Sequence, residues 1–326
     1  MSAAPPCPLC ASPAPKAFVR DWREYKLYDC PDCGAGFCVP FKNPGPEYYQ
    51  QKKDIYLSDV EETTDPASFE YDEALARLAR GAAPGARLLD VGCGAGGFLH
   101  RARAAGFSAA GLDFNPARVA ALRARGFDVF AGGLPEFARR AAPASFDAIS
   151  IFQVLEHLDD PAAWLGAAKS LLKPDGLLIV AVPNRDRTFD PFKGPGLDEI
   201  DNPPHHLTRW DSAALSRLLT RSGFVVAELF AAGYPLPLAR MLFRNTFRFG
   251  LAVRALNVDQ MRHAPSAATA VSSGIKERAV RLAVAIKSAV LDGIVWTGYP
   301  FFRLAAAAFG WQGVPLVAVA RKPRAG

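Results

Sequence analysis

Short apolar runs alternate with segments of helical periodicity along the middle of this chain. The apolar runs predict buried β-strands at residues 86–91, 107–113, 127–132, 146–152, 176–182, 224–230 and 314–322. The periodic segments predict α-helices at residues 68–80, 94–105, 116–125, 160–172 and 211–223. Because strands that are apolar almost throughout must be covered on both faces, we expect an α/β fold with a seven-stranded, mostly parallel sheet between helices.

Four parts are expected from composition and periodicity. A small cysteine-containing module is expected at residues 1–45, followed by a linker and leading helix at 46–80. The α/β domain would comprise residues 81–235 and 311–326. Before its last strand, residues 236–310 form a predicted helical insertion with ten Lys or Arg and three Asp or Glu residues. The net charge of +6 therefore belongs to this insertion, and the rest of the chain is close to neutral.

The composition is that of an ordinary globular protein, with 50% hydrophobic and 21% charged residues. The first residues, MSAAPPCPLC, lack the basic segment and apolar core of a signal peptide. No apolar run convincingly reaches the roughly 20 residues that span a bilayer. We therefore expect a cytoplasmic protein.

Four of the six cysteines have the spacing of a metal site. They form two C-x-x-C pairs, CPLC and CPDC, and comprise Cys7, Cys10, Cys30 and Cys33. Two such pairs can place four thiolates around one tetrahedral zinc ion. Four protein ligands leave no open coordination position, so we expect a structural zinc ribbon. Cys38 and Cys93 are left over, and Cys93 is interpreted as a small filler within a glycine loop.

The stretch LLDVGCGAGGF fits two kinds of glycine loop, one for dinucleotides and one for S-adenosylmethionine (SAM). Asp90, two residues before the first glycine, decides between the two ligands. A carboxylate this close to the glycine loop would repel a pyrophosphate but suits the ammonium group of SAM. Asp113 ends the second strand, where its carboxylate can accept hydrogen bonds from both ribose hydroxyls. Phe114 could pack on the adenine ring. SAM is therefore the expected ligand.

The motifs LLDVGCGAGGF, GLDFNP, FDAISIFQVLEHLDDP and LLKPDGLLIVAVPN follow one another in this order. As a set they resemble class I SAM-dependent methyltransferases, specifically the ubiquinone-biosynthesis-like and glycan-cluster branch. The resemblance covers about residues 70–235 and the last strand. A four-cysteine module ahead of the domain is familiar from bacterial members of this branch. The resemblance implies a Rossmann-like sheet of seven strands and a methyltransferase activity.

The resemblance and the loop together give a set of expected SAM-binding residues. They are Asp90, Gly92, Gly94, Gly96, Asp113, Phe114, Gly133, Leu134, Phe152 and Gln153. One departure from the family is that Gly132-Gly133-Leu134 stands where an acidic residue commonly holds the adenine amino group. A backbone group or Glu136 would have to replace that acid.

Methyl transfer to a hydroxyl needs a group that removes a proton. Glu156 and His157 follow the fourth strand, and His205 and His206 lie in the loop after the fifth; these four are the catalytic candidates. Some relatives arrange E-x-x-E-H and a distant histidine around a divalent cation. That resemblance implies a cation at Glu156, His157 and His205 or His206, although Gln153 replaces the first acid and weakens Mg²⁺ binding in particular.

The expected function is methyl transfer from SAM to a small-molecule, glycan or lipid-linked acceptor, most readily at oxygen. The alternatives are a non-catalytic SAM-fold module that binds partners through its ribbon and insertion, and a dehydrogenase.

In the insertion, Arg240, Arg244 and Arg248 recur every four residues and would form one helical stripe. Three roles of the insertion remain open: a cap over the substrate pocket, a dimer contact, and peripheral contact with an anionic membrane. A nucleic-acid partner is disfavoured. The sequence leaves the oligomeric state open.

Overall fold

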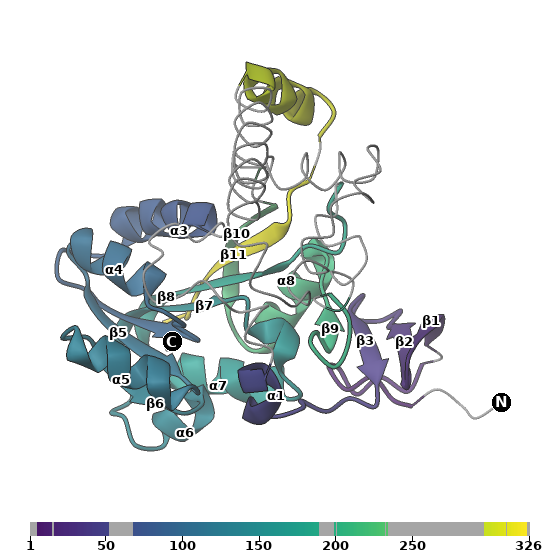
Figure 1. Cartoon of the computed structure of the whole chain (residues 1–326), viewed down its shortest axis with the longest axis horizontal. Helices are drawn as coiled ribbons and strands as arrows, with labels where there is room; N and C mark the ends of the chain where they lie inside the picture. Colours follow the sequence, from purple (N-terminus) through teal and green to yellow (C-terminus); the bar gives the residue numbers. More distant parts are fainter. Residues whose placement is uncertain are drawn as a thin grey trace, which may run out of the picture. The chain divides into compact units, whose positions relative to one another are not determined.

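The structure is a computed structural model of the full chain, and it describes residues 5–14, 16–51, 68–188, 199, 201–231, 233, 297–310 and 312–324. The chain divides into two compact units. One comprises residues 1–188, 195–232 and 312–326, and the other comprises residues 189–194 and 233–311. All described strands, which Figure 1 labels, belong to the first unit, and so does the candidate site described below.

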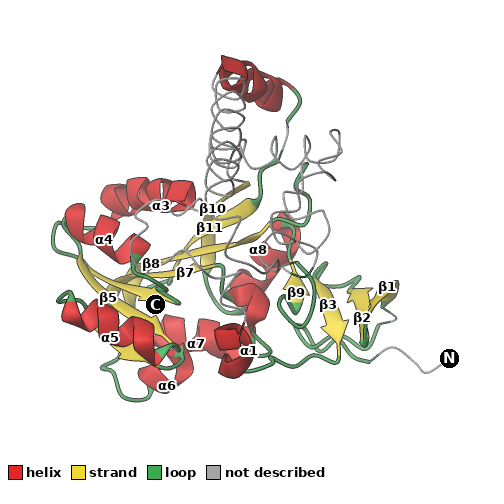
Figure 2. Ribbon diagram, viewed as in Figure 1, coloured by secondary structure: helices red, strands yellow, loops and turns green. Residues whose placement is uncertain are grey.

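A seven-stranded sheet forms the centre of the first unit (Figure 2). Its strands lie in the order β10-β11-β8-β7-β4-β5-β6. Strand β11 is antiparallel to both of its neighbours, while the pairs from β8 to β6 are parallel. The strands are β4 (Arg87–Val91), β5 (Ser108–Asp113), β6 (Asp128–Ala131), β7 (Phe146–Phe152), β8 (Leu172–Pro183), β10 (Val225–Ala231) and β11 (Pro315–Arg321). The predicted seven-stranded, mostly parallel α/β sheet is confirmed.

Helices pack on both faces of this sheet because successive strand residues point to opposite sides. Helix α3 (Ser68–Gly81) and α4 (Gly97–Ala104) cover one face, over Leu88, Ala148 and Ile179. On the other face, α7 (Pro161–Leu171) and α8 (Ser212–Arg221) pack over Leu89, Ile149 and Leu178. Helix α5 (Pro116–Ala124) connects β5 to β6, and α6 (Leu134–Ala138) follows β6 at this edge of the sheet.

Several helix ends follow from local sequence. Asp160 and Asp211 cap α7 and α8, since their carboxylates accept from the backbone N–H groups of Ala163 and Ala214 at 3.0 and 2.8 Å. The predicted helix start at residue 94 is too early, because Gly94 and Gly96 have positive φ angles and α4 begins at Gly97. The strand predicted at 176–182 extends over Leu172–Pro183.

The N-terminal module is a small sheet of its own, and it includes one strand from far along the chain. Its order is β1 (Ala17–Trp22), β2 (Tyr25–Asp29), β3 (Gly36–Val39) and β9 (Thr208–Arg209), all antiparallel. Helix α1 (Pro46–Gln51) follows it, and a short 3₁₀ turn η1 (Leu155–His157) follows β7. The pairing of β3 with β9 was not expected from the sequence.

Most of the predicted insertion lies outside the described residues, including the stripe of Arg240, Arg244 and Arg248. Its described part is residues 297–310, which are helical up to residue 308. The side chains of Phe301, Leu304 and Phe309 are exposed there. Among the described helices, none combines the length and the apolar character that a membrane span requires.

Candidate active site

The glycine loop joins β4 to α4 in a backbone conformation that requires glycine. Gly92 has a φ of +76°, and a Cβ there would lie 2.4 Å from Val154 Cγ2. Gly96 has a φ of +89° at the N-cap of α4, and a Cβ would lie 2.5 Å from Leu122 Cδ2. Any side chain at either position would combine a strained backbone with a collision. The loop therefore brings its backbone close to the carboxyl edge of the sheet, where such folds bind ligands.

Asp90 lies at this edge and is buried, with 3% of its surface exposed. Ser150 of the neighbouring strand β7 donates a hydrogen bond from Oγ to Asp90 Oδ1 at 2.7 Å. Burial raises the pKa of Asp90 to about 7, the nearby Asp113 adds to the rise, and the Ser150 hydrogen bond opposes it. A cation bound beside Asp90 would restore its ionised form at neutral pH.

Asp113 ends β5 and is fixed by two backbone groups. Its Oδ2 accepts from Gly94 N–H at 2.9 Å, and its Oδ1 accepts from Asn115 N–H at 2.8 Å. Each carboxylate oxygen can accept a further hydrogen bond. The expected role toward two ribose hydroxyls is therefore compatible with the geometry. Phe114 is 44% exposed beside it, so its ring is available to a ligand.

The residues expected to contact adenine lie after β6. Gly133 is the N-cap of α6, and Leu134 is fully buried in the core, which leaves its backbone as the group that could reach a ligand. Glu136 pairs with Arg140 one turn later at 2.8 Å. Phe152 also packs inward, 4.8 Å from the ring of Phe98.

Gln153 follows β7 in the left-handed region, with a φ of +52°. Such a conformation is uncommon for a residue other than glycine and often accompanies a functional site. Its side-chain Nε2 donates to Glu70 Oε2 at 3.2 Å. Glu70 was not a candidate in the sequence, because an acid in the first turn of an amphipathic helix is ordinarily a solvated residue.

The four catalytic candidates form one cluster. Glu156 and His157 lie on η1, whereas His205 and His206 precede β9. The ring centroids of His157, His205 and His206 are between 4.7 and 4.9 Å apart. His205 and His206 do not diverge as adjacent side chains usually do; both are buried, and both backbone N–H groups bond to the carbonyl of Asn202.

Two of the histidines are oriented through their Nδ1 atoms. His157 Nδ1 lies 2.6 Å from the carbonyl oxygen of His205, and His206 Nδ1 lies 3.2 Å from Asp201 Oδ1. Both partners are acceptors, so each Nδ1 carries the hydrogen and each Nε2 keeps its lone pair. Burial lowers the pKa of both rings, to about 3 for His157, where His206 contributes further. The rings are neutral at physiological pH.

Both Nε2 atoms lie near the same carboxylate. Glu156 Oε1 is 3.9 Å from His157 Nε2 and 3.9 Å from His206 Nε2. Glu156 is 1% exposed, and neither of its oxygens has a hydrogen-bond partner in the structure. Burial raises the pKa of Glu156 well above its usual value, and the charges of Glu70 and Asp201 add to this. Acceptor atoms thus converge on one point from which water is excluded.

This donor set fits a divalent cation. One ligand atom from each of His157, His205 and His206 can be chosen so that all lie within 4.8 Å of one another. Metal–ligand bonds of about 2.1 Å place tetrahedral ligands about 3.4 Å apart, so a modest contraction would close the site. Histidines whose Nδ1 groups are held by a carboxylate or a carbonyl are the usual metal ligands.

The N-terminal module holds this cluster in place. Strand β3 pairs with β9 immediately after His206, and Cys38 N–H donates to the Leu207 carbonyl at 3.1 Å. Asn43 Nδ2 donates to the His157 carbonyl at 2.6 Å. Tyr49 on helix α1, which follows the module, places its ring centroid 5.5 Å from that of His157. The module is therefore part of the wall of the candidate active site.

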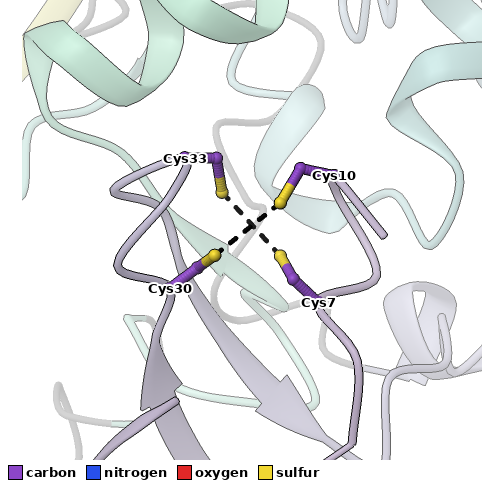
Figure 3. Close-up of side chains that lie close together, drawn as sticks. All are labelled: Cys7, Cys10, Cys30 and Cys33. Atoms are coloured by element: carbon purple, nitrogen blue, oxygen red, sulfur yellow. Dashed lines mark hydrogen bonds between the residues drawn. The ribbon is translucent and has the colours of Figure 1, made fainter. Parts of the chain in front are cut away.

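The four cysteines of the two C-x-x-C pairs converge as expected, and their sulfur atoms point toward a common centre (Figure 3). The Sγ atoms of Cys7 and Cys33 are 3.8 Å apart, and those of Cys10 and Cys30 are 3.7 Å apart. Zinc–sulfur bonds of about 2.3 Å in a tetrahedron separate the sulfurs by about 3.8 Å. The six cysteines are all free, so no disulfide competes for these thiols. The site fits zinc.

Sequence reasoning missed the residues that support the cluster. Asp201 orients His206 and is itself paired with Arg187 at 2.6 Å. Asn43 and Glu70 reach the site from segments far away along the chain. The one available signal was the run DEIDNPPHH, in which an acid lies five residues before His206.

Comparison with known proteins identifies the family of the α/β domain. A family model described as a methyltransferase domain matches residues 67–229, half of the chain. A probable S-adenosylmethionine-dependent methyltransferase of Mycolicibacterium smegmatis is 34% identical over 163 residues, which cover 49% of this chain and 60% of that protein. A ubiquinone biosynthesis O-methyltransferase of Xanthomonas campestris pv. campestris is 40% identical over 114 residues, covering 33% of this chain and 47% of that protein.

The chain thus spans about half the length of the curated relatives it matches. Among solved structures, a SAM-dependent methyltransferase from Archaeoglobus fulgidus has a TM-score of 0.46 at 18% identity, covering 84% of this chain and 99% of that chain. The family match and the strand order with a single antiparallel strand agree with the resemblance found in the sequence motifs. The chain belongs to the methyltransferase domain family and has the class I fold of SAM-dependent methyltransferases.

Proposed function

We propose that this chain transfers the methyl group of SAM to an oxygen atom of a small-molecule, glycan or lipid-linked acceptor. The observation that carries the proposal is the placement of a glycine loop with Asp90 and Asp113 at the sheet edge that also leads to the Glu156–histidine cluster. The relative named as a ubiquinone biosynthesis O-methyltransferase supports transfer to oxygen.

The proposed donor site uses the backbone of the glycine loop and two carboxylates. Asp113 would bind the ribose hydroxyls, since backbone N–H groups hold both of its oxygens. Asp90 would face the methionyl end and favour its ammonium group. The methyl group of a sulfonium is already electrophilic, so the protein has to align the acceptor and remove its proton.

A divalent cation is proposed at Glu156, His157 and His206. A bound cation would lower the pKa of an acceptor hydroxyl and fix its position. Two imidazole nitrogens and one carboxylate suit Mn²⁺, Fe²⁺ or Zn²⁺ better than Mg²⁺, which prefers oxygen ligands. With His157 and His206 oriented toward Glu156, His205 is the proposed proton acceptor.

A structural zinc ion is proposed at Cys7, Cys10, Cys30 and Cys33. Burial and the neighbouring thiol raise the pKa of Cys10, while the backbone at Ser12 and the guanidinium of Arg221 on α8 act to lower it. The backbone at Ala35 acts in the same lowering direction on the pKa of Cys33, against the contact with Cys7 and burial. Positive charge at this point would offset the excess negative charge of a zinc ion with four thiolates.

The competing proposal is a SAM-binding module without catalysis, acting through its ribbon and insertion. The convergence of Glu156 with oriented histidines favours the enzyme, because a binding module has no need of a buried set of metal ligands. Cytoplasmic location is proposed from the sequence, with membrane contact through residues 236–310 as an alternative.

Calorimetry with SAM and NAD tests the donor. We expect SAM to bind, and NAD to bind more weakly or not at all. The Asp113→Ala substitution should lower the affinity for SAM by more than about tenfold. Methyl-labelled SAM incubated with hydroxylated acceptors tests the reaction. Tight SAM binding without transfer, together with full biological function of a His205→Ala/His206→Ala double variant, would establish the non-catalytic module instead.

A further inference from the structure

One face of the small sheet carries a row of three residues in register. Asp29 on β2 is the Cα partner of Gly36 on β3, which in turn is the partner of Arg209 on β9 (Figure 1). Directly paired residues point to the same side of a sheet. A Cβ on Gly36 would lie 3.1 Å from Asp29 Oδ1 and 3.2 Å from Arg209 Cβ. The glycine therefore leaves a gap between an acid and a guanidinium.

A cavity of about 70 Å³ lies at this gap. One water molecule needs about 10–15 Å³, so the cavity has room for a group of several non-hydrogen atoms. Arg185 is a further charged wall residue, and the apolar walls include Val19, Leu27, Phe37 and Leu207. His206 also lines the cavity, and its ring is part of the proposed cation cluster. The cavity therefore adjoins the candidate active site.

Arg209 is bonded to uncharged acceptors. Its Nη2 donates to the Asp201 carbonyl at 2.9 Å and to Asn202 Oδ1. Among the described residues, Arg209 forms no ion pair, and its Nε and Nη1 have no acceptor. Burial lowers the pKa of Arg209; the charge of Asp201 opposes this effect, and the charge of Arg20 adds to it. The positive charge of Arg209 is therefore poorly compensated by the protein.

Arg20 converges on the same amide oxygen. It is the Cα partner of Leu27, so it lies on the face of the sheet that Leu27 and Asp29 share. Its Nη2 donates to Asn202 Oδ1 at 2.6 Å, and within the described part of the chain Arg20 has no ion pair. Two guanidinium groups thus share one neutral oxygen and repel each other. An anion between them would relieve this repulsion.

The acid of the cavity does not supply that anion. Asp29 Oδ1 accepts from Arg185 Nη1 at 3.2 Å, and Arg185 is shared with Asp211 at the N-cap of α8. These three groups carry one net negative charge, against two positive charges on Arg20 and Arg209. The cavity therefore remains cationic.

A phosphoryl group fits this arrangement better than a carboxylate. Guanidinium groups bind phosphate through parallel hydrogen bonds, and a phosphomonoester offers three terminal oxygens and nearly two negative charges. It can bond with Arg20 and Arg209 at once, whereas a carboxylate has two oxygens and one charge. We propose that the cavity holds a phosphoryl group of the methyl acceptor against Arg20 and Arg209; this inference rests on the proposed function. The acceptor is then a phosphorylated small molecule or a phosphate-linked glycan or lipid.

Calorimetry with small anions tests the cavity on the full chain, without added Mn²⁺. The probes are inorganic phosphate, methyl phosphate and acetate at equal ionic strength. We expect both phosphates to bind more tightly than acetate, and Arg20→Gln and Arg209→Gln each to lower phosphate affinity by about tenfold or more. Lys26→Gln, an exposed position on β2 that pairs with Asp21, should bind like the parent protein.

Gly36→Ala is a second test that keeps every charge in place. The added methyl group would fill the gap between Asp29 and Arg209, so phosphate affinity should fall although both guanidinium groups remain. Zinc content and SAM affinity report the folding of each variant, and both should match the parent protein. If an arginine variant lost zinc or SAM binding, Gly36→Ala would decide the question.

Parent-like phosphate affinity in Arg20→Gln and Arg209→Gln, or in a folded Gly36→Ala, would overturn the site. An equal loss in Lys26→Gln would overturn it too, because the binding would then follow net charge alone. Exclusion of methyl phosphate would show that the cavity takes a free anion and no part of an acceptor. A parent protein that binds both phosphates through these residues but fails to bind SAM would instead refute the proposed donor.

Discussion

His206 and Asp201 are joined by a contact of 3.2 Å between Nδ1 and Oδ1, and this contact directs the other ring nitrogen of His206 toward Glu156. Burial alone would raise the pKa of Asp201, but the hydrogen bond from His206 and the charge of Arg187 hold it below its usual value. Asp201 is therefore an anion that fixes the tautomer and the direction of the His206 ring.

Asp201→Asn should weaken cation binding without abolishing it. An amide can turn its nitrogen toward His206 and so favour the wrong tautomer. We expect the affinity for Mn²⁺, measured by calorimetry, to fall by about 10- to 100-fold. Asp128→Asn, an exposed position at the start of β6, should leave Mn²⁺ binding unchanged. Parent-like affinity in Asp201→Asn would exclude a role in orienting a metal ligand.

Cation binding to the histidine cluster should release a proton from Glu156. The pKa of this carboxyl is raised by burial, so it is protonated in the cation-free protein over a range in which the neighbouring rings are neutral. A cation requires the carboxylate, so affinity should rise with pH until Glu156 is ionised without it. Mn²⁺ titrations between about pH 6 and 8, in buffers of different ionisation enthalpy, measure the release. The Glu156→Gln variant should bind Mn²⁺ weakly and should release no such proton. An unchanged proton release in this variant would show that the proton comes from another group.

SAM affinity should weaken as the pH falls below about 7, the raised pKa of Asp90. Affinity falls at low pH because the positively charged ligand binds the ionised carboxylate of Asp90. Below the pKa, Asp90 has to lose its proton before the ligand binds. The loss should approach about tenfold per pH unit well below that value. Asp90→Asn should bind SAM more weakly near pH 8 and show a flat profile. A pH-independent affinity in the parent protein would place the charge of Asp90 outside the donor site.

Removal of the ribbon metal should disturb the histidine cluster as well as the N-terminus. We expect elemental analysis to find one zinc per chain, lost in a Cys30→Ser/Cys33→Ser variant. Because β3 pairs with β9 directly after His206, this variant should also bind Mn²⁺ more weakly. Cys93→Ser should retain zinc, since Cys93 lies away from the four-cysteine cluster. A zinc-free variant with parent-like Mn²⁺ affinity would show that the module does not support the cluster.

Local patterns were sufficient to predict the seven-stranded sheet and most of its helices, although the short helix α6 was not expected. The apolar runs identified all seven strands, and Asp160 and Asp211 mark helix starts through their own side-chain hydrogen bonds. The two C-x-x-C pairs were predictable for the same reason, because each pair closes a tight turn within a few residues. The start of α4 was misplaced because left-handed glycines end a helix that the apolar periodicity alone would extend.

The candidate site was predictable only in part. Glu156, His157, His205 and His206 were recognised by residue type, but their convergence on one carboxylate depends on distances between segments that the sequence does not encode locally. Glu70 and Asn43 were missed because a helix-start acid and a loop amide look the same whether they face water or a buried site.

The sequence by itself determined the α/β architecture, the thiol ligands and the glycine loop, since each depends on periodicity or on spacing within a few residues. The tertiary structure decided which residues share a site. Strand pairing between β3 and β9 joins segments about half a chain apart, and packing of α3 against α4 buries an acid that periodicity treats as solvated. Burial and partner distance set the charge state of a carboxylate, and both arise only when distant segments pack together.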